Sequence, residues 1–277
     1  MSMNHDLTTA HKKLRVLVTR PHKQAQPLLR LLQDRGYDIL HFPCLSIVPI
    51  TADSVTGRQC RLRASELDRY QHIIIVSANA ATCWLPWVDR YWTQRPMEVH
   101  WWAMGEATRY RLQLLDITAQ RPNRGDDSEA LLASLLPQLK ASDRVLIVRG
   151  VGGRGAVAEA CRAHSVQVDY AECYSRQMPP ASQADIACVT DYQPSVILCQ
   201  SGETLVNFNR MMTRQLGLKQ HQIMIVVPSQ RVADIAYDLG FGEVKISSSA
   251  SDQAMCDVLD QGFDILPNGL ESPANST

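Results

Sequence analysis

The sequence predicts an α/β protein built from two copies of one parallel-sheet unit. Its 277 residues exceed the length of one typical domain and are enough for two. Short β-rich runs alternate with amphipathic helical stretches, as where residues 15–18 precede the apolar positions of 28–32. This alternation is typical of parallel strands joined by helical crossovers. Four blocks of the first half recur in the second half in the same order, which indicates a duplicated unit.

The internal repeat consists of loosely similar segments separated by a nearly constant offset. The pairs are VLVTR at 16–20 with VLIVR at 145–149, IIVSAN at 74–79 with LCQSGE at 198–203, WAMGEA at 102–107 with IVVPSQ at 225–230, and DDSEALL at 126–132 with SASDQAM at 249–255. No single pair is specific, but the occurrence of all four pairs in the same order is a specific signal. We therefore expect equivalent strands and equivalent strand ends in the two copies.

Composition excludes several classes of protein. Lys+Arg and Asp+Glu number 28 each, and no basic run occurs, so we expect no nucleic-acid partner. The apolar runs are far shorter than the ~20 residues of a membrane helix, so we expect no membrane partner either. The first residues lack the apolar core of a signal peptide, which favours a cytoplasmic protein. The eight cysteines are dispersed without a C-x-x-C pair, which argues against a disulfide framework and against a zinc site.

Ligands of open parallel sheets bind beyond the carboxyl ends of the strands. Most of these ends combine Ser, Thr or Gly with the start of a helix, where backbone N–H groups and the helix dipole favour carboxylates or phosphates. Helix capping alone would explain the same residue types. The strand-end residues that we expect to bind substrate are Arg20, Ser77, Asn79, Gly105, Thr108, Arg149, Gly150, Gly152, Ser201, Gly202 and Ser229.

The segment 150–155 reads GVGGRG and follows a strand, as in the dinucleotide-binding fingerprint. Two observations disfavour this interpretation. The equivalent turn at 20–25 has no glycine, and Asp169 follows the last glycine too closely for the ribose-binding acid. No nucleophile elbow, zinc-protease helix motif or Walker A motif occurs. We expect no cofactor and no metal, and a nucleotide-dependent enzyme remains an alternative.

The ordered motifs resemble those of the uroporphyrinogen-III synthase family. The resemblance covers about residues 14–265, and its motifs are VLVTRP at 16–21, FP at 42–43, SAN at 77–79, GEAT at 105–108, VRG at 148–150 and CYSR at 173–176. It implies two flavodoxin-like parallel-sheet domains joined by a two-stranded β-ladder.

The resemblance also implies that the two domains interleave along the chain. The expected parts are residues 14–42 plus 176–265 for one domain, 50–168 for the other, and 43–49 and 169–175 for the connectors. The polar, low-complexity ends, 1–13 and 266–277, are expected to be disordered.

The reaction that the resemblance implies is the closure of hydroxymethylbilane, a linear tetrapyrrole with acetate and propionate groups. The family removes its hydroxyl as water, inverts the last pyrrole through a spiro intermediate and closes the ring. Electron-rich pyrroles expel the hydroxyl themselves, so orientation and one proton donor are the main demands on the protein. We accordingly expect a cofactor-free lyase, monomeric, with a tetrapyrrole as its small-molecule partner. The alternative is a non-catalytic two-domain ligand-binding protein.

Two residues carry the family's expected roles. The family's candidate acid, a tyrosine beside the second connector, maps onto Tyr174, although packing in the connector would also explain a tyrosine there. A family threonine maps onto Thr108. The chain departs from the family pattern at Ser229-Gln230, where Thr-Thr is common, and at Val76 and Gln200, where the family has a threonine before the serine.

Overall fold

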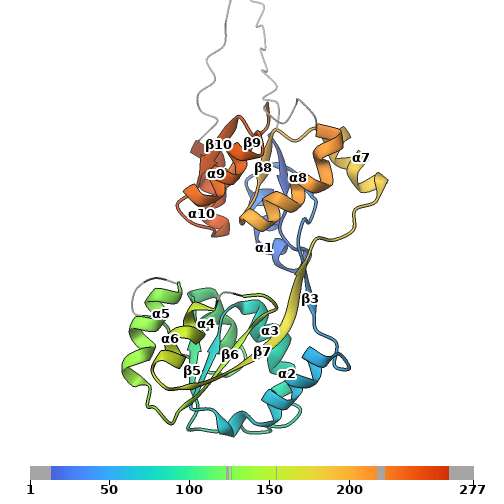
Figure 1. Cartoon of the computed structure of the whole chain (residues 1–277). Helices are drawn as coiled ribbons and strands as arrows, with labels where there is room; N and C mark the ends of the chain where they lie inside the picture. The colour runs from blue at the N-terminus through green and yellow to red at the C-terminus, as the bar shows by residue number, and fades with distance from the viewer. Residues whose placement is uncertain (1–13, 123–124, 126, 154, 217–221, 262–277) are drawn as a thin grey trace, which may run out of the picture. The chain divides into compact units, whose positions relative to one another are not determined.

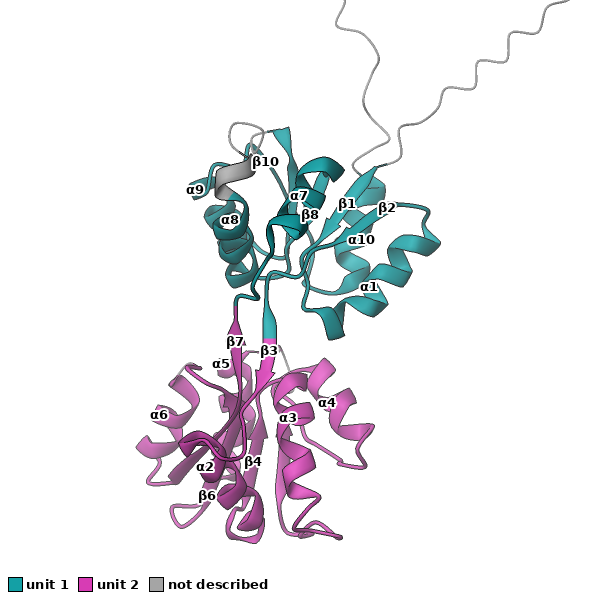
Figure 2. Cartoon of the chain, turned by 90° about the vertical axis from the view of Figure 1, so that its right-hand side faces the viewer, with its two compact units in different colours: residues 1–46, 178–277 teal, residues 47–177 magenta. Residues whose placement is uncertain are grey.

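The computed structural model describes residues 14–122, 125, 127–153, 155–216 and 222–261. The expected disorder of 1–13 and 266–277 concerns residues outside these ranges. The chain divides into two compact units, which Figure 2 shows in teal and magenta. Unit 1 contains residues 1–46 and 178–277, and unit 2 contains residues 47–177. The chain therefore leaves unit 1, builds unit 2, and returns.

Unit 1 contains a parallel five-stranded sheet in the order β10-β9-β8-β1-β2 (Figure 1). Its strands are β1 (Arg15–Val18), β2 (Asp38–His41), β8 (Val196–Leu198), β9 (Met224–Val227) and β10 (Glu243–Ile246). In the register of the central strands, Leu17 pairs with Ile197. The first strand of the chain thus shares a sheet with strands from the last third of the sequence.

Unit 2 contains a second five-stranded sheet in the order β3-β7-β6-β4-β5. Its strands are β3 (Ser46–Pro49), β4 (His72–Ile75), β5 (His100–Ala103), β6 (Arg144–Gly150) and β7 (Gln167–Gln177). The pairs β4–β5, β4–β6 and β6–β7 are parallel. The carboxyl ends of β4, β5, β6 and β7 therefore meet at one edge of this sheet.

The expected connectors turn out to belong to the sheet of unit 2. Residues 169–175 lie within β7, which pairs with β6 from Gln167 to Tyr174. In the stretch 43–49, only Ser46–Pro49 forms a strand, and β3 lies beside β7 at the edge of the sheet. Because β7 has β6 on one side and β3 on the other, the β3–β7 pair is continuous with the sheet.

Helices cover both faces of the sheet in unit 1. One face carries α1 (His22–Asp34) and α10 (Asp252–Gln261), and the other carries α7 (Gln183–Tyr192), α8 (Gly202–Leu216) and α9 (Gln230–Asp238). In α1, Ala25, Leu28 and Leu32 are fully buried at helical spacing. Period-two alternation in β1 places Leu17 on one face, and Val16 and Val18 on the other.

Unit 2 has the same three layers. Helices α2 (Val55–Ser65), α3 (Ala78–Val88) and α4 (Glu106–Gln113) cover one face, and α5 (Ser128–Leu135) and α6 (Ala156–Ala163) cover the other. Two short 3-10 turns, Leu67–Arg69 and Leu136–Gln138, complete the described elements. The predicted α/β class with two parallel sheets is confirmed.

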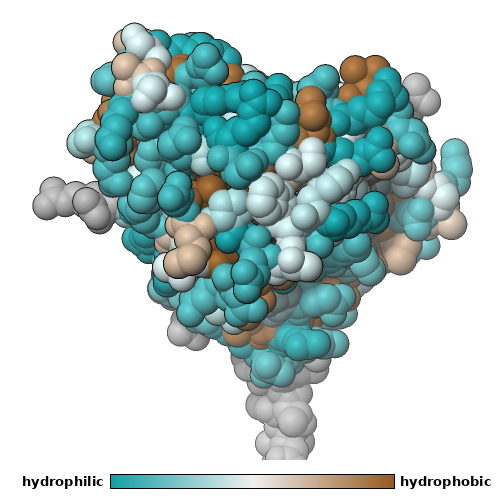
Figure 3. Space-filling view, turned by 90° about the horizontal axis from the view of Figure 1, so that it is seen from below, coloured by the Kyte–Doolittle hydropathy of each residue, from teal (hydrophilic) through white to brown (hydrophobic). Residues whose placement is uncertain are grey.

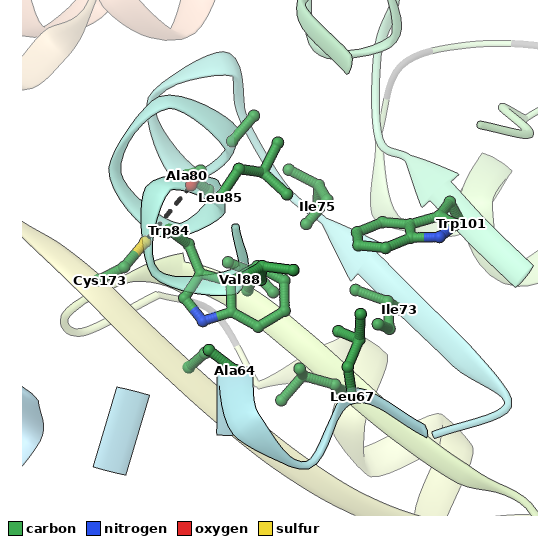
Figure 4. Packing of buried hydrophobic residues seen from close by; sticks show 14 of the residues in the cluster. Ala64, Leu67, Ile73, Ile75, Ala80, Trp84, Leu85, Val88, Trp101 and Cys173 are labelled. Atoms are coloured by element: carbon green, nitrogen blue, oxygen red, sulfur yellow. Dashed lines mark hydrogen bonds between the residues drawn. The ribbon is translucent and has the colours of Figure 1, made fainter. Parts of the chain in front are cut away.

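A tryptophan-rich core fixes α3 against the sheet of unit 2 (Figure 4). Trp84 is fully buried, and its ring centroid lies 6.5 Å from that of Trp101. The Cys173 thiol donates to the Ala80 carbonyl oxygen, which ties β7 to the first turn of α3. A large aromatic side chain at the centre of such a core is worth about 3–5 kcal/mol. The start of α3 is therefore held rigidly at the sheet edge.

On the face of the molecule in Figure 3, hydrophobic side chains are scattered among hydrophilic ones instead of forming one patch. Single exposed apolar residues are normal on a folded protein. In the part of the chain that the structure describes, no helix is long and apolar enough to cross a membrane.

The buried His72, the first residue of β4, contacts Trp102 of β5 and Asp143 just before β6. Trp102 Nε1–H donates to His72 Nδ1 at 3.2 Å, and His72 Nε2 lies 3.4 Å from Asp143 Oδ2. The His100 ring stacks on His72 at 5.2 Å. Because an indole N–H can only donate, Nδ1 must accept, so His72 is neutral with its proton on Nε2. Burial lowers the pKa of His72, and His100 adds to this, whereas Asp143 opposes it.

We expect acid to destabilise the protein through His72. Since its folded-state pKa lies below the unfolded value of about 6.5, the unfolded chain binds the proton first. Stability should fall as the pH drops below about 6.5 and level off below the folded pKa. Melting curves from about pH 8 to about pH 5 measure this, and His72→Gln should flatten the slope. The control is His164→Gln, which makes the same substitution at an exposed histidine of unit 2. An unaltered slope in His72→Gln would contradict the assignment.

Candidate functional site

A cavity of about 380 Å³ opens at the carboxyl ends of the strands in unit 2. It lies where the strand order reverses: β5 lies on one side of β4, and β6 and β7 lie on the other. Helices from opposite faces diverge at such a switch point and leave a crevice that commonly binds ligands. The lining residues are Val76, Ser77, Met104, Asp127, Ser128, Arg149, Gly150, Gly153, Tyr174 and Arg176.

A β-bulge in β7 directs Tyr174 toward the cavity. The β6–β7 register runs regularly to Arg149, which faces Glu172, but Gly150 then faces Tyr174, so Cys173 is an extra residue. Regular alternation would put Cys173 and Tyr174 on opposite faces of the sheet. Both instead belong to one buried cluster, and Tyr174 is only 5% exposed. Bulges re-aim side chains in this way beside functional sites.

Gly150 provides the space for the Tyr174 ring. A Cβ atom at position 150 would lie 2.7 Å from both Cε2 and Cζ of Tyr174, well inside van der Waals contact. Any side chain at position 150 would therefore displace the ring. The glycine is required by close packing of two neighbouring strands.

The Tyr174 hydroxyl is positioned by Ser77. The two hydroxyl oxygens are 3.1 Å apart, and Ser77 Oγ also accepts a hydrogen bond from the Ala80 backbone N–H at 3.1 Å as the N-cap of α3. Burial raises the pKa of Tyr174, and the Ser77 hydrogen bond and the charge of Arg176 oppose this only in part. The phenol therefore carries its proton at neutral pH and can donate it to a bound group.

Arg149 anchors the glycine-containing turn after β6. Its Nε and Nη2 atoms donate to Glu172 Oε1 at 3.1 and 2.9 Å, and Nη1 donates to the Gly153 carbonyl oxygen at 3.0 Å. The guanidinium also lies 3.9 Å above the Tyr170 ring centroid. With this many contacts of its own, Arg149 positions the turn, while Arg176 adds a second cation to the lining.

Two helices begin at the cavity and give it a positive field. Ser77 caps α3, and Asp127 caps α5 by accepting from the Ala130 N–H at 2.8 Å. Helix N-termini attract carboxylates and phosphates. The Asp127 carboxylate, in contrast, can accept from an N–H group of a ligand. The cavity thus offers donors for anions, one acidic acceptor and one buried proton donor.

The cavity brings together Ser77, Arg149, Gly150 and Tyr174 from the expected set. The other expected residues of unit 2 lie nearby in sequence without lining it. Gly105 is the N-cap of α4, and Thr108 is 4% exposed, its N–H bonded to the Gly105 carbonyl oxygen. Asn79 lies in the first turn of α3, and Gly152 has a positive φ of 76° in the exposed turn.

The remaining expected residues belong to unit 1. Arg20 follows β1 and forms an ion pair with Asp252, the first residue of α10. Ser201 caps α8 by accepting from the Thr204 N–H at 3.2 Å, and Gly202 begins that helix. Ser229 is the N-cap of α9, but its hydroxyl makes no capping hydrogen bond.

Sequence reasoning missed Val76, Met104, Asp127, Ser128, Gly153 and Arg176 as lining residues. Two sequence features could have pointed to some of them. Asp127 and Ser128 lie in one of the repeated blocks, and Arg176 lies in the CYSR motif. In the described ranges, no group of three or more His, Cys, Asp or Glu residues could hold a metal ion.

Known proteins share both the sequence pattern and the fold. A family model described as Uroporphyrinogen-III synthase HemD matches residues 26–257. The uroporphyrinogen-III synthases of Escherichia coli and Salmonella typhimurium are 28% and 26% identical over 255 and 252 residues, which is 87% of this chain and 97% of each relative. The solved structures of a mutant uroporphyrinogen III synthase from Thermus thermophilus and of the synthetase from Helicobacter pylori each align with a TM-score of 0.59. The Thermus structure is 10% identical, and the alignment covers 90% of this chain and 98% of that one. The Helicobacter structure is 12% identical, and the alignment covers 90% of this chain and 99% of that one. Both therefore show the same fold.

We expect Gly150→Ala to destabilise the protein by about 1–3 kcal/mol, because the new methyl group overlaps the Tyr174 ring. Urea denaturation measures the free energy of unfolding. In a double-mutant cycle with Tyr174→Ala, removal of the ring should abolish most of the loss. Gly152→Ala is the control from the same turn, since no atom lies within 4 Å of its added Cβ and only backbone strain remains. Additive effects of Gly150→Ala and Tyr174→Ala would show that the ring contact is not the cause.

Proposed function

The chain belongs to the uroporphyrinogen-III synthase family, and we propose that it closes hydroxymethylbilane to uroporphyrinogen III with inversion of the last pyrrole ring. The family match over residues 26–257 carries this proposal. In reaction class the enzyme would be a cyclising hydro-lyase, since water leaves as the ring closes. A non-catalytic ligand-binding protein is not favoured, because the relatives named above are synthases.

In the proposed mechanism, Tyr174 is the general acid. As the pyrrole nitrogen pushes electrons toward the hydroxymethyl carbon, the C–O bond breaks and the phenol O–H donates its proton, so that water leaves. The phenolate regains a proton when the closing pyrrole loses one and recovers its aromaticity. Burial supports this role because it raises the pKa of Tyr174 and keeps the proton in place until the leaving oxygen develops charge. Ser77 holds the hydroxyl in one direction.

The lining of the cavity supports tetrapyrrole binding. The starts of α3 and α5 and the Arg176 guanidinium suit acetate and propionate groups, and Asp127 suits a pyrrole N–H. Arg20, Ser201, Gly202 and Ser229 remain proposed binding residues of unit 1. Fixing the substrate in this way selects inversion over direct closure, because orientation decides which pyrrole carbon is attacked. We also propose that the protein is a monomer, which sedimentation equilibrium would test. A cytoplasmic location is a further proposal.

We expect the purified protein to convert hydroxymethylbilane to the type III isomer, and added EDTA to leave the rate unchanged. Oxidation of the product followed by chromatographic separation of the porphyrin isomers measures this. A sample without protein provides the type I product of uncatalysed closure. Type I product formed at that uncatalysed rate in the presence of protein would rule out the proposed function.

Tyr174→Phe should lower kcat by about 10- to 100-fold, the low end for a general acid, because water can replace the phenol as a donor. KM should stay within about twofold, since the interaction forms mainly in the transition state. Steady-state kinetics measure both constants. Tyr110→Phe removes the same hydroxyl from an exposed tyrosine of α4 and should have no effect. Thr108→Ala should have a smaller effect than Tyr174→Phe. Full kcat in Tyr174→Phe together with a loss in Thr108→Ala would show that Tyr174 is not the acid.

A further inference from the structure

The sheet of unit 1 has a switch point of its own. From β1 the chain proceeds to β2 on one side, whereas β8, β9 and β10 lie on the other. The general rule for such sheets places ligands at the carboxyl ends of β1 and β8. The Thr19 hydroxyl donates to the Leu198 carbonyl oxygen at 2.7 Å and ties these two ends together. Gln200 lies two residues after Leu198, just beyond the carboxyl end of β8.

The internal repeat gives Gln200 a counterpart in unit 2. The blocks IIVSAN at 74–79 and LCQSGE at 198–203 align Gln200 with Val76, and Ser201 with Ser77. In unit 2 both counterparts line the cavity. Position 200 therefore corresponds to a cavity-lining position of unit 2, where valine is enough for packing alone.

The side chain of Gln200 is polar where packing does not require it. Its Nε2 and Oε1 atoms are both shielded from solvent, and neither has a hydrogen-bond partner in the described part of the chain. Buried amides in native proteins almost always have partners, because an unpaired one destabilises the fold. An unpaired amide just beyond the end of β8 is therefore a candidate to bind a ligand group.

Further donors surround the start of α8. A Cβ atom built on Gly202 would lie 3.9 Å from Arg231 Nη1, so this guanidinium reaches the first turn of α8 from the neighbouring helix α9. Arg231 is exposed and forms no ion pair or hydrogen bond with another described residue. The nearby acid, Glu203, is already engaged in an interaction of its own. A helix start, a guanidinium and an amide N–H together select a carboxylate.

We propose that Gln200 and Arg231 form a carboxylate-binding subsite at the switch point of unit 1. The Gln200 amide is shielded from solvent in this structure, so its side chain must turn to meet the ligand. Its Nε2–H then donates to one oxygen of an acetate or propionate, and Arg231 neutralises the charge. The identity of the carboxylate rests on the proposed function. Both residues bind the substrate directly, and they affect the reaction only through its orientation, because the carboxylate is remote from the reacting atoms.

The test uses Gln200→Met, which keeps the side-chain length and removes the amide, and Arg231→Gln. The control is Arg30→Gln, which removes an exposed charge from α1, remote from these strand ends. Isothermal titration with uroporphyrin III measures binding, and kinetics with hydroxymethylbilane measure KM, kcat and the isomer ratio. Each test variant should raise Kd and KM about tenfold, as expected for a lost hydrogen bond to a charged group, and should increase the share of type I product. Gln200→Met should also raise Tm, because it removes an unpaired buried amide.

The outcomes separate this subsite from the proposed function. A higher Tm in Gln200→Met with wild-type Kd, KM and isomer ratio would mean that the amide binds nothing, and would overturn the proposal. Type III synthesis by the wild type, with Kd unchanged in both variants, would leave the function standing and remove the subsite. If the wild type binds uroporphyrin III without forming type III product, and both variants weaken that binding, the subsite stands and the function fails.

Discussion

The contact between the Tyr174 ring and the bare Cα of Gly150 determines the arrangement of the site in unit 2. It requires a glycine at position 150, because a Cβ atom there would lie 2.7 Å from the ring. It also requires the extra residue Cys173, which turns Tyr174 toward the face that carries α3. Once the ring is in place, its hydroxyl meets Ser77, which is held as the cap of α3. The position, direction and protonation of the phenol all follow from this packing.

The rest of unit 2 keeps this arrangement rigid. Trp84 and its neighbours hold α3 on the sheet, and Arg149 clamps the turn after β6 through Glu172 and Gly153. Close-packed interiors resist small displacements, so a hydroxyl at the edge of such a core keeps its direction. That matters for a reaction in which the substrate supplies most of the chemical drive and the protein supplies orientation.

The two units share a fold but present different groups at equivalent strand ends. Unit 2 combines Val76 and Ser77 with a buried phenol, whereas unit 1 combines Gln200 and Ser201 with the guanidinium of Arg231. After a duplication, the sheet and its caps are constrained by packing, but side chains at the strand ends are free to diverge. We infer that unit 2 carries the acid and that both units contribute to carboxylate binding.

The sequence by itself determined the α/β class, and it indicated the repeat and the candidate residues at the strand ends, because periodicity, capping residues and repeats are local patterns. It also singled out Tyr174, Ser77 and Gly150, three of the residues that meet at the cavity. Only the tertiary structure decided that Arg149 anchors a turn, that Thr108 is buried within α4, and that Asp127 and Arg176 line the cavity. It alone revealed the bulge at Cys173 and the unpaired amide of Gln200. The physical reason is that strand register and hydrogen-bond satisfaction depend on partners distant in the chain, which no local pattern specifies.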